Sequence, residues 1–320
     1  MSRVKLNHIT DDDLVEGTSL GRDAWLRLRK NRVAMISLWL LTAVVILCFV
    51  VAWFCTDPNV INLTNKFASP SAEHWLGTDQ LGRDLFSRIL YGGQISMLVG
   101  FVATAVTLLI GISYGAVSGY MGGRPDSLLM RIVDTLYAIP FLVLVIILKV
   151  VIAGLVTDLA GWTVENFGWN KEFVFRFANI IPLFITIGAL GWLTLARITR
   201  AQILSIKNQE FVEAARSLGL SDRRILFRHI VPNTVGTAIV YATLTIPSFI
   251  LYEASLSYLG MGVEAPNSSW GILIKEGANF LETQPSLLII PGLFFSVTLF
   301  SLNFLGDGLR DALDPKASKD

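Results

Sequence analysis

Few side chains in this sequence of 320 residues have the type and spacing that chemistry requires. The three histidines, His8, His74 and His229, lie in separate segments, which predicts no metal-binding cluster. The sequence contains no Gly-x4-Gly-Lys-Ser/Thr loop, the motif whose backbone cradles the phosphates of ATP. We therefore expect no catalytic residue, metal ligand or cofactor-binding residue in this chain.

Ionisable side chains inside long apolar segments are the remaining candidates. Asp134, Lys149 and Glu253 lie within such segments, the first two near the segment ends. An acid buried in a membrane is costly, and it usually pairs with a partner or faces a water-filled path. Glu253 is therefore either a contact for a cationic substrate group or a hydrogen-bonded structural acid. No intramembrane carboxylates are paired, so the sequence does not indicate a proton relay.

The composition places these segments in a membrane. The chain is 53% hydrophobic and 16% charged, whereas ordinary globular proteins are about 25% charged. Its mean hydropathy is +0.58. These values exclude a disordered chain and a conventional water-soluble enzyme. The net charge of +1 gives no overall attraction to nucleic acid.

We predict six membrane-spanning helices, since each span needs about 20 mostly apolar residues. The predicted spans cover residues 34–54, 95–117, 132–153, 180–196, 235–259 and 287–305. The first span follows a long polar segment and has no clean cleavage site after it, so we expect it to remain as an anchor.

Lysine and arginine residues are unevenly distributed between the predicted loops. Nineteen fall in residues 1–33, 118–131, 197–234 and 306–320, whereas six fall in the intervening loops. Cytoplasmic loops carry the excess of basic residues. The sequence therefore predicts that both termini are cytoplasmic.

Three further patterns predict local packing. Residues 19–32 mix apolar side chains with five basic ones, which predicts a helix lying in the membrane interface against anionic lipids. Gly111, Gly115 and Gly119 leave one face of the second span without bulk, which predicts close approach by a neighbouring helix. The aromatic residues within 162–177 indicate an aromatic belt at the outer interface or a surface for an external partner.

The loop between the fourth and fifth spans is too long and too regular for a simple connection. Phe211, Ala214, Ala215 and Leu218 recur at helical spacing, and Gly219 follows where a left-handed backbone conformation would end the helix.

A second short helix is expected over residues 222–230, capped by Ser221 and stopped by Pro232. Two short helices joined by a glycine turn, exposed on the cytoplasmic side, have a shape that fits a groove on a partner.

The first of these helices carries a recognisable motif. Glu213-Ala214-Ala215-x3-Gly219 resembles the EAA motif of the membrane subunits of ABC importers, which docks onto the ATP-binding subunits. The family pattern continues with nine residues and then Ile-x-Leu-Pro. Here that register reads His229-Ile230-Val231-Pro232, so Pro232 fits, Val231 is a mild change and His229 departs from the isoleucine. The resemblance implies an ATPase-docking site made of Phe211, Glu213, Ala214, Ala215, Leu218 and Gly219.

Other blocks are similar to the C-type permeases of oligopeptide and dipeptide importers. They are Leu76-Gly77-Thr78-Asp79-x2-Gly82-Arg83-Asp84, Gly119-Tyr120-x-Gly122-Gly123, Leu256-Ser257-Tyr258-Leu259-Gly260-x-Gly262 and the run from Gly306 to Pro315. Together the resemblance covers roughly residues 20–316.

This resemblance implies an all-α polytopic membrane protein with the type I ABC importer permease fold, in a bacterial inner membrane. We divide the chain into a cytoplasmic N-terminal segment with an interfacial helix (1–33), the first span with its periplasmic loop (34–94), a five-helix core (95–305) that contains the coupling loop (197–234), and a cytoplasmic tail (306–320).

The implied function is the import of short peptides. The implied partners are a second permease subunit, two ATP-binding subunits that hold ATP and Mg²⁺, an extracytoplasmic peptide-binding protein and membrane lipids, without nucleic acid. The chain itself would not be an enzyme. On the translocation path, Glu253 could attract the N-terminal ammonium group of a peptide.

Two kinds of alternative remain open at the level of sequence. Relatives of this family move nickel chelates, glutathione or peptide antibiotics, and no residue separates these substrates. A six-span chain could also act alone as a channel or secondary transporter, but that class expects several intramembrane charges or an inverted repeat. A membrane-embedded hydrolase is disfavoured because no nucleophile lies in a recognisable arrangement with a base.

Overall fold

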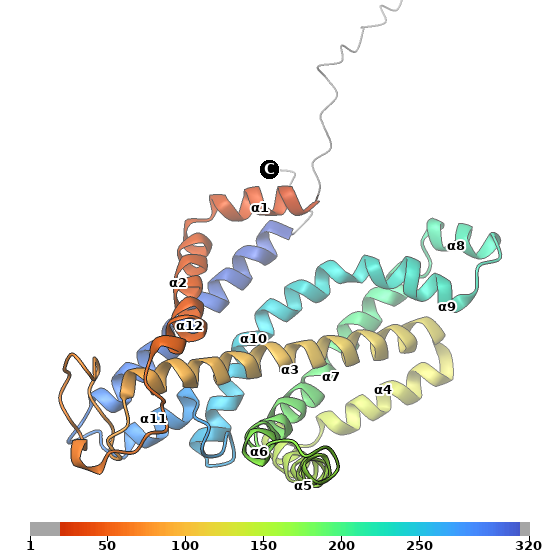
Figure 1. The fold of residues 1–320 in the computed structure, drawn as a ribbon. Coiled ribbons are helices and arrows are strands. Elements are labelled where there is room, and N and C mark those ends of the chain that lie inside the picture. Colours follow the sequence, from red (N-terminus) through yellow and green to blue (C-terminus); the bar gives the residue numbers. More distant parts are fainter. Residues whose placement is uncertain (1–19, 314–320) are drawn as a thin grey trace, which may run out of the picture.

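The computed structural model describes residues 20–313, and their secondary structure is helical without a β-strand (Figure 1). The helices are α1 (Leu20–Lys30), α2 (Arg32–Phe49), α3 (Leu85–Met121), α4 (Gly123–Tyr137), α5 (Phe141–Phe167), α6 (Lys171–Ala178), α7 (Ile181–Ile206), α8 (Glu210–Ser217), α9 (Asp222–Ile225), α10 (Val235–Tyr258), α11 (Trp270–Ala278) and α12 (Ser286–Leu313). Short 3₁₀ turns cover Val51–Phe54, Leu63–Asn65 and Val231–Thr234, and a π-helical turn covers Leu226–Ile230.

Six helical segments among the described residues are long and apolar enough to cross a membrane, which agrees with the predicted number. They are Arg32–Phe54, Leu85–Met121, Phe141–Phe167, Lys171–Ile206, Asp222–Tyr258 and Ser286–Leu313. Helix α3 runs from one end of the molecule to the other (Figure 1). Its 37 residues correspond to about 55 Å, well beyond the roughly 30 Å of a hydrocarbon core.

The third span differs from the prediction over residues 132–153. Helix α4 ends at Tyr137 and α5 begins at Phe141, so the span lies further along the chain. The physical reason is Pro140, because the residue before a proline avoids helical geometry and a proline suits the start of a helix. Asp134 consequently belongs to α4 and lies outside the span.

The close contact between α3 and α7 is the central packing feature of the bundle. At Gly111, Gly115 and Gly119 of α3, a Cβ atom would lie within 3 Å of α7. The backbone oxygen of Ala196 is the nearest atom to Gly115, at 2.3 Å from the position of that Cβ. The predicted close approach is therefore confirmed, and α7 is the neighbour.

Helix α1 lies across the end of α12. Ala24 and Leu28 pack in one apolar cluster with Ala312, whereas Trp25 and Leu26 are exposed. The predicted helix over residues 19–32 is present as α1, and its contact with lipid headgroups stays a prediction.

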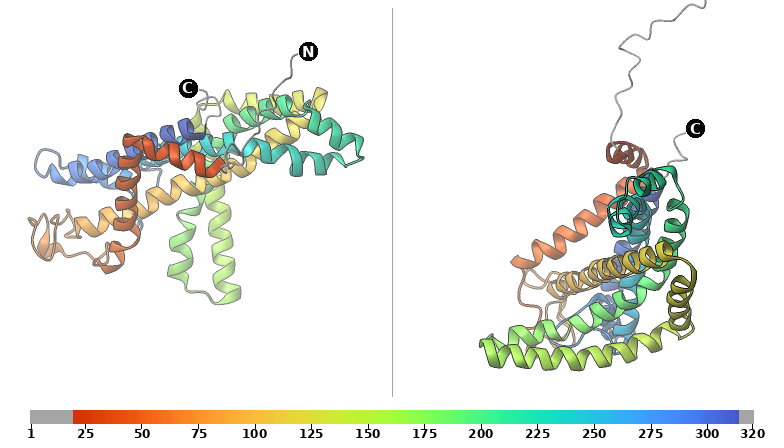
Figure 2. Two further views of the ribbon diagram at one scale, coloured as in Figure 1. Left: turned by 90° about the horizontal axis from the view of Figure 1, so that it is seen from above. Right: turned by 90° about the vertical axis from the view of Figure 1, so that its right-hand side faces the viewer.

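Helix α5, with α6 and the start of α7, stands apart from the rest of the molecule (Figure 2, left). Only Val145 and Ala160 of its side chains are buried. A span with so little coverage has most of its surface available for lipid or for another subunit.

We expect a methyl group added at Gly115 to destabilise the bundle, whereas one added at Gly292 of α12 does not. A Cβ at Gly115 forces α3 and α7 apart, but a Cβ at Gly292 meets nothing within 4 Å. Overpacking of this kind costs about 1–3 kcal/mol. Thermal unfolding of the purified permease should give a lower Tm for Gly115→Ala than for Gly292→Ala. Equal Tm values would contradict the packing argument.

Candidate functional site

Helix α8 is attached to the ends of α3 and α7, at the end of the molecule that we term the α8 end (Figure 1). Val212 and Ala215 are buried on its inner side. They pack in a cluster with Ala116 of α3, Ile203 of α7, and Ile225, Leu226 and Ile230 of the following segment. This cluster fixes the helix on the permease.

The outer side of α8 is open. Leu218 is 81% exposed and Phe211 is 41% exposed, although both are large and apolar. Glu213 and Ala214 are exposed between them. Two large apolar side chains thus flank a small residue and a charged one, and the described chain covers none of them. Such a surface is suited to a partner protein.

Ala215 does not belong to this surface, contrary to the prediction from spacing. Its side chain faces the permease itself together with Val212. The reason is geometric, because Ala214 and Ala215 are separated by about 100° around a helix of 3.6 residues per turn. The alternation of Val212 and Ala215 with the exposed positions could have indicated the inner side, but sequence reasoning did not use Val212.

A glycine turn ends α8 as predicted. Gly219 has φ of +77°. The Leu220 N–H donates to the carbonyl of Ala215 at 3.3 Å, and the Gly219 N–H donates to the carbonyl of Arg216 at 3.0 Å. These two bonds form a Schellman motif, which satisfies carbonyl groups left open at a helix end.

The segment after the turn departs from the prediction of a short helix stopped at Pro232. Ser221 lies at the N-cap of α9, but its side chain makes no capping hydrogen bond. Pro232 lies in the first turn of the Val231–Thr234 3₁₀ helix. A proline in a first turn needs no intrahelical N–H bond. The helical path therefore continues into α10.

Polar contacts join this segment to the core. Tyr120 of α3 donates its hydroxyl to Asp222 at 2.6 Å. At the end of α7, before α8, Lys207 donates to the carbonyl of Gly119 of α3 at 3.0 Å. A shallow basic depression of about 490 Å³ lies beside α9, and Arg223, Arg224 and Arg228 line it with Phe227. At the level of sequence, these arginines indicated only which side of the membrane the loop lies on.

An ion pair ties the start of α4 to α7. Arg200 donates two hydrogen bonds to Asp126, each of 2.6 Å, and Ser118 donates a third at 2.5 Å. Hydrogen bonding from Arg200 holds the pKa of Asp126 below its ordinary value of 3.8. This carboxylate therefore stabilises the fold above its unfolded-state pKa, and the contribution is lost only as the pH falls through the lowered value.

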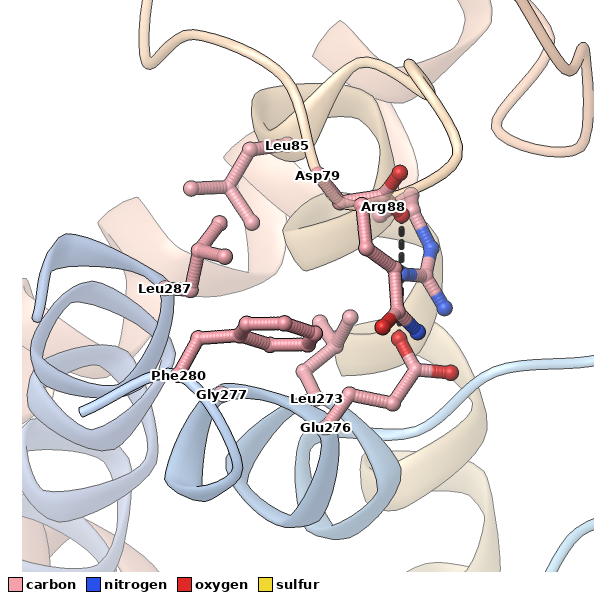
Figure 3. Close-up of a pocket in the computed structure, with 9 residues that line it drawn as sticks. Asp79, Leu85, Arg88, Leu273, Glu276, Gly277, Phe280 and Leu287 are labelled. Atoms are coloured by element: carbon pink, nitrogen blue, oxygen red, sulfur yellow. Dashed lines mark hydrogen bonds and ion pairs between the residues drawn. The ribbon is translucent and has the colours of Figure 1, made fainter. Parts of the chain in front are cut away.

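The opposite end of the molecule, which we term the α11 end, contains the block around Asp79 (Figure 3). Arg88 of α3 is 4% exposed and lies between Asp79, at 2.6 Å, and Glu276 of α11, at 2.7 Å. Arg83 contacts the same two carboxylates. The adjacent cavity is about 10 Å³, enough for about one water molecule. These ion pairs hold the loop that contains Asp79 against α3 and α11, and the adjacent cavity has no room for a substrate.

Glu253 of α10 is fully buried. Its carboxylate accepts hydrogen bonds from Ser96 of α3 at 2.9 Å and from Ser257 at 2.6 Å. The two hydroxyl groups give it partners within the protein, as the structural interpretation of this acid requires.

A Gly-x-Ser-x-Gly sequence occurs at residues 111–115, and it lies inside the continuous helix α3. A nucleophile elbow instead needs a sharp turn between a strand and a helix. This sequence therefore serves helix packing. Among the described residues, no group of three or more His, Cys, Asp or Glu side chains could hold a metal ion.

Comparison with known proteins gives two family matches. Residues 108–319 match the model described as "Binding-protein-dependent transport system inner membrane component". Residues 19–70 match the N-terminal TM domain of oligopeptide transport permease C.

Individual relatives are similar over nearly the whole chain. The oligopeptide transport system permease protein OppC of Haemophilus influenzae is 44% identical over 310 residues, which cover 94% of this chain and 90% of the relative. OppC of Escherichia coli is 44% identical over 305 residues, which cover 94% and 93%. The dipeptide transport system permease protein DppC of Bacillus subtilis is 41% identical over 310 residues, which cover 95% and 89%.

Substitution of Gly219 tests the turn that ends α8. We expect Gly219→Val to raise amide hydrogen exchange in residues 210–221, because a β-branched residue is strained at positive φ. Gly219→Asn should remain close to the native protein, since asparagine tolerates this conformation. The position is otherwise open, with nothing within 4 Å of an added Cβ. Equal exchange in the two variants would contradict a strained turn.

Proposed function

Because the chain belongs to the family of binding-protein-dependent transport system inner membrane components, we propose that it is one permease subunit of an ABC importer for short peptides. The observation that carries this conclusion is the identity of 41–44% to oligopeptide and dipeptide permeases over about 94% of the chain. This similarity favours peptides over nickel chelates, glutathione or peptide antibiotics. The six apolar segments make the chain a multi-pass protein of the inner membrane.

The permease works in a complex of several subunits. Its partners are a second permease subunit, two ATP-binding subunits and an extracytoplasmic peptide-binding protein. ATP and Mg²⁺ bind in the ATP-binding subunits, which supply the hydrolysis. The weakly covered surface of α5 is available to the second permease subunit.

The outer side of α8 is the docking surface for an ATP-binding subunit. Phe211 and Leu218 supply apolar contacts, Ala214 lets the partner approach the helix backbone, and Glu213 supplies a charge. The arginines of the depression beside α9 favour an acidic rim on the partner. The exposed Gly219 turn supports this surface at the end of α8.

Motion of the docked ATPase reaches the spans through two connections. The inner side of α8 is fixed to α3 and α7 by the Val212 and Ala215 cluster. The helical path from Asp222 to Tyr258 leads directly into the fifth span. A displacement of α8 therefore moves helices of the bundle rather than a loose loop.

The α8 end is the cytoplasmic end, and both termini are cytoplasmic. The basic residues of α8, α9 and their flanks support this orientation by the positive-inside rule. The loop with Asp79, which follows the first span, then faces the periplasm.

The function is tested with the complete complex in proteoliposomes. We expect the permease to co-purify with a second permease and two ATPases, and the complex with its binding protein to accumulate the tripeptide Ala-Ala-Ala when ATP is supplied. Import of Ni²⁺ chelates without import of peptides would overturn the peptide assignment.

Docking at α8 is tested by a bulky residue in the middle of its outer side. Ala214→Trp should weaken ATPase binding about 30-fold, since loss of a central interface contact costs about 2 kcal/mol or more. Ser127→Trp, on an exposed position of α4, is the matched control. Co-purification of the ATPases measures the effect. Undiminished ATPase stoichiometry and uptake in Ala214→Trp would exclude docking at this surface.

The orientation is tested by cysteine labelling in a cysteine-free background, with Cys48 and Cys55 replaced. Ser69→Cys should react with an impermeant maleimide added to the periplasmic side of the membrane. Ser127→Cys should react only after the membrane is opened. Both positions are exposed in the permease. The opposite labelling pattern would reverse the assignment of the two sides.

A further inference from the structure

A cavity of about 520 Å³ lies between α4, α5, α7 and α10, and it opens at the surface of the chain, since Tyr137, Ile139 and Tyr252 of its lining are exposed. It is bounded by the turn between α4 and α5, the start of α5, the middle of α7 around Leu190 and Thr194, and the stretch of α10 from Tyr241 to Tyr252. Its volume is within the roughly 300–1,000 Å³ that is typical of ligand-binding sites.

The lining of this cavity combines apolar side chains with hydroxyl groups and carries no charge. None of its residues is Asp, Glu, Lys, Arg or His. Six of them carry hydroxyl groups, namely Tyr137, Thr194, Tyr241, Thr245, Ser248 and Tyr252. Three of these hydroxyls belong to tyrosine rings, and the rings of Phe141 and Tyr252 lie 4.5 Å apart.

The nearby charges are engaged outside the cavity. Arg197 pairs with Asp134 at 2.6 Å toward the α8 end, where its guanidinium lies 4.3 Å from the ring centre of Tyr137. Lys149 donates to the carbonyl of Gly262 at 2.9 Å and to Glu264 at 3.1 Å. Glu253 does not line the cavity and is held by Ser96 and Ser257.

We propose that this cavity is the chain's share of the peptide path, and that it contacts peptide backbones through hydroxyl groups without selecting side chains by charge. The proposal rests on the proposed function. A hydroxyl both donates and accepts a hydrogen bond, so it pairs equally with the N–H and C=O groups that every peptide carries. The aromatic rings accommodate apolar side chains.

A charge-free lining suits a path that must release what it binds. Within a protein cavity, a fixed charge attracts or repels a charged side chain more strongly than it does in bulk water. Peptides with side chains of the opposite charge would then be retained, and peptides with side chains of the same charge would be excluded. Weak contacts to the backbone allow peptides of either sign to enter and leave.

The test is to introduce a charge into the lining and measure selectivity. Ser248 is exposed to the cavity and its replacement disturbs no buried packing. In proteoliposomes with saturated binding protein, the native complex should import Ala-Lys-Ala and Ala-Glu-Ala at rates within about threefold. Ser248→Asp should shift this ratio about tenfold toward the basic peptide, and Ser248→Lys should shift it toward the acidic one.

Two control variants locate the effect. Asn303→Asp adds the same charge at an exposed position of α12, away from the lining, and should leave the ratio unchanged. Glu253→Gln should also leave it unchanged. A large shift of the ratio in Glu253→Gln would identify Glu253 as the selecting charge and would overturn the proposal.

The remaining outcomes are distinguishable. An unchanged ratio in both Ser248 variants, with normal import by the native complex, overturns the cavity assignment. Absence of import by the native complex overturns the proposed function instead. If both variants abolish import, a tripeptide carrying benzoylphenylalanine is bound to the native complex and irradiated. Crosslinks within residues 241–252 support the assignment, and their absence overturns it.

Discussion

The contact of α3 with α7 is the constraint on which the rest of the molecule depends. Lipid supplies no hydrophobic force between helices, so spans associate where small residues let their backbones meet. Gly111, Gly115 and Gly119 provide that contact here, against Ala196 and its neighbours. One end of this pair carries α8, the middle of α7 borders the cavity, and the extension of α3 reaches the ion pairs around Arg88.

The placement of polar groups follows from the cost of leaving them unpaired in the membrane. Ion pairs occupy the two ends of the bundle, at Asp126 with Arg200 and at Asp79 with Arg88. Inside, the buried acid Glu253 is surrounded by serine hydroxyls. Among the described residues, no buried side-chain nitrogen or oxygen atom lacks a hydrogen-bond partner.

The sequence was sufficient for the features that depend on local chemistry. Apolar length predicted the number of spans, glycine spacing predicted the close helix contact, and Gly219 predicted the left-handed turn. The sequence was insufficient for the features that depend on tertiary packing. The spacing of Ala214 and Ala215 gives a helix, but which of them faces the permease depends on α3 and α7. Likewise Pro232 ends isolated helices, yet here it begins a turn that continues into α10.

The unbroken helical path from Asp222 into α10 has a thermodynamic consequence for the importer. This path begins after the Gly219 turn that follows α8, the proposed docking helix, and it borders the cavity from Tyr241 to Tyr252. Two binding events that bias the same structural element are linked, and the coupling between them is reciprocal. If closure of the ATPase changes the affinity of the cavity for a peptide by some factor, a bound peptide changes the affinity of the permease for the closed ATPase by the same factor.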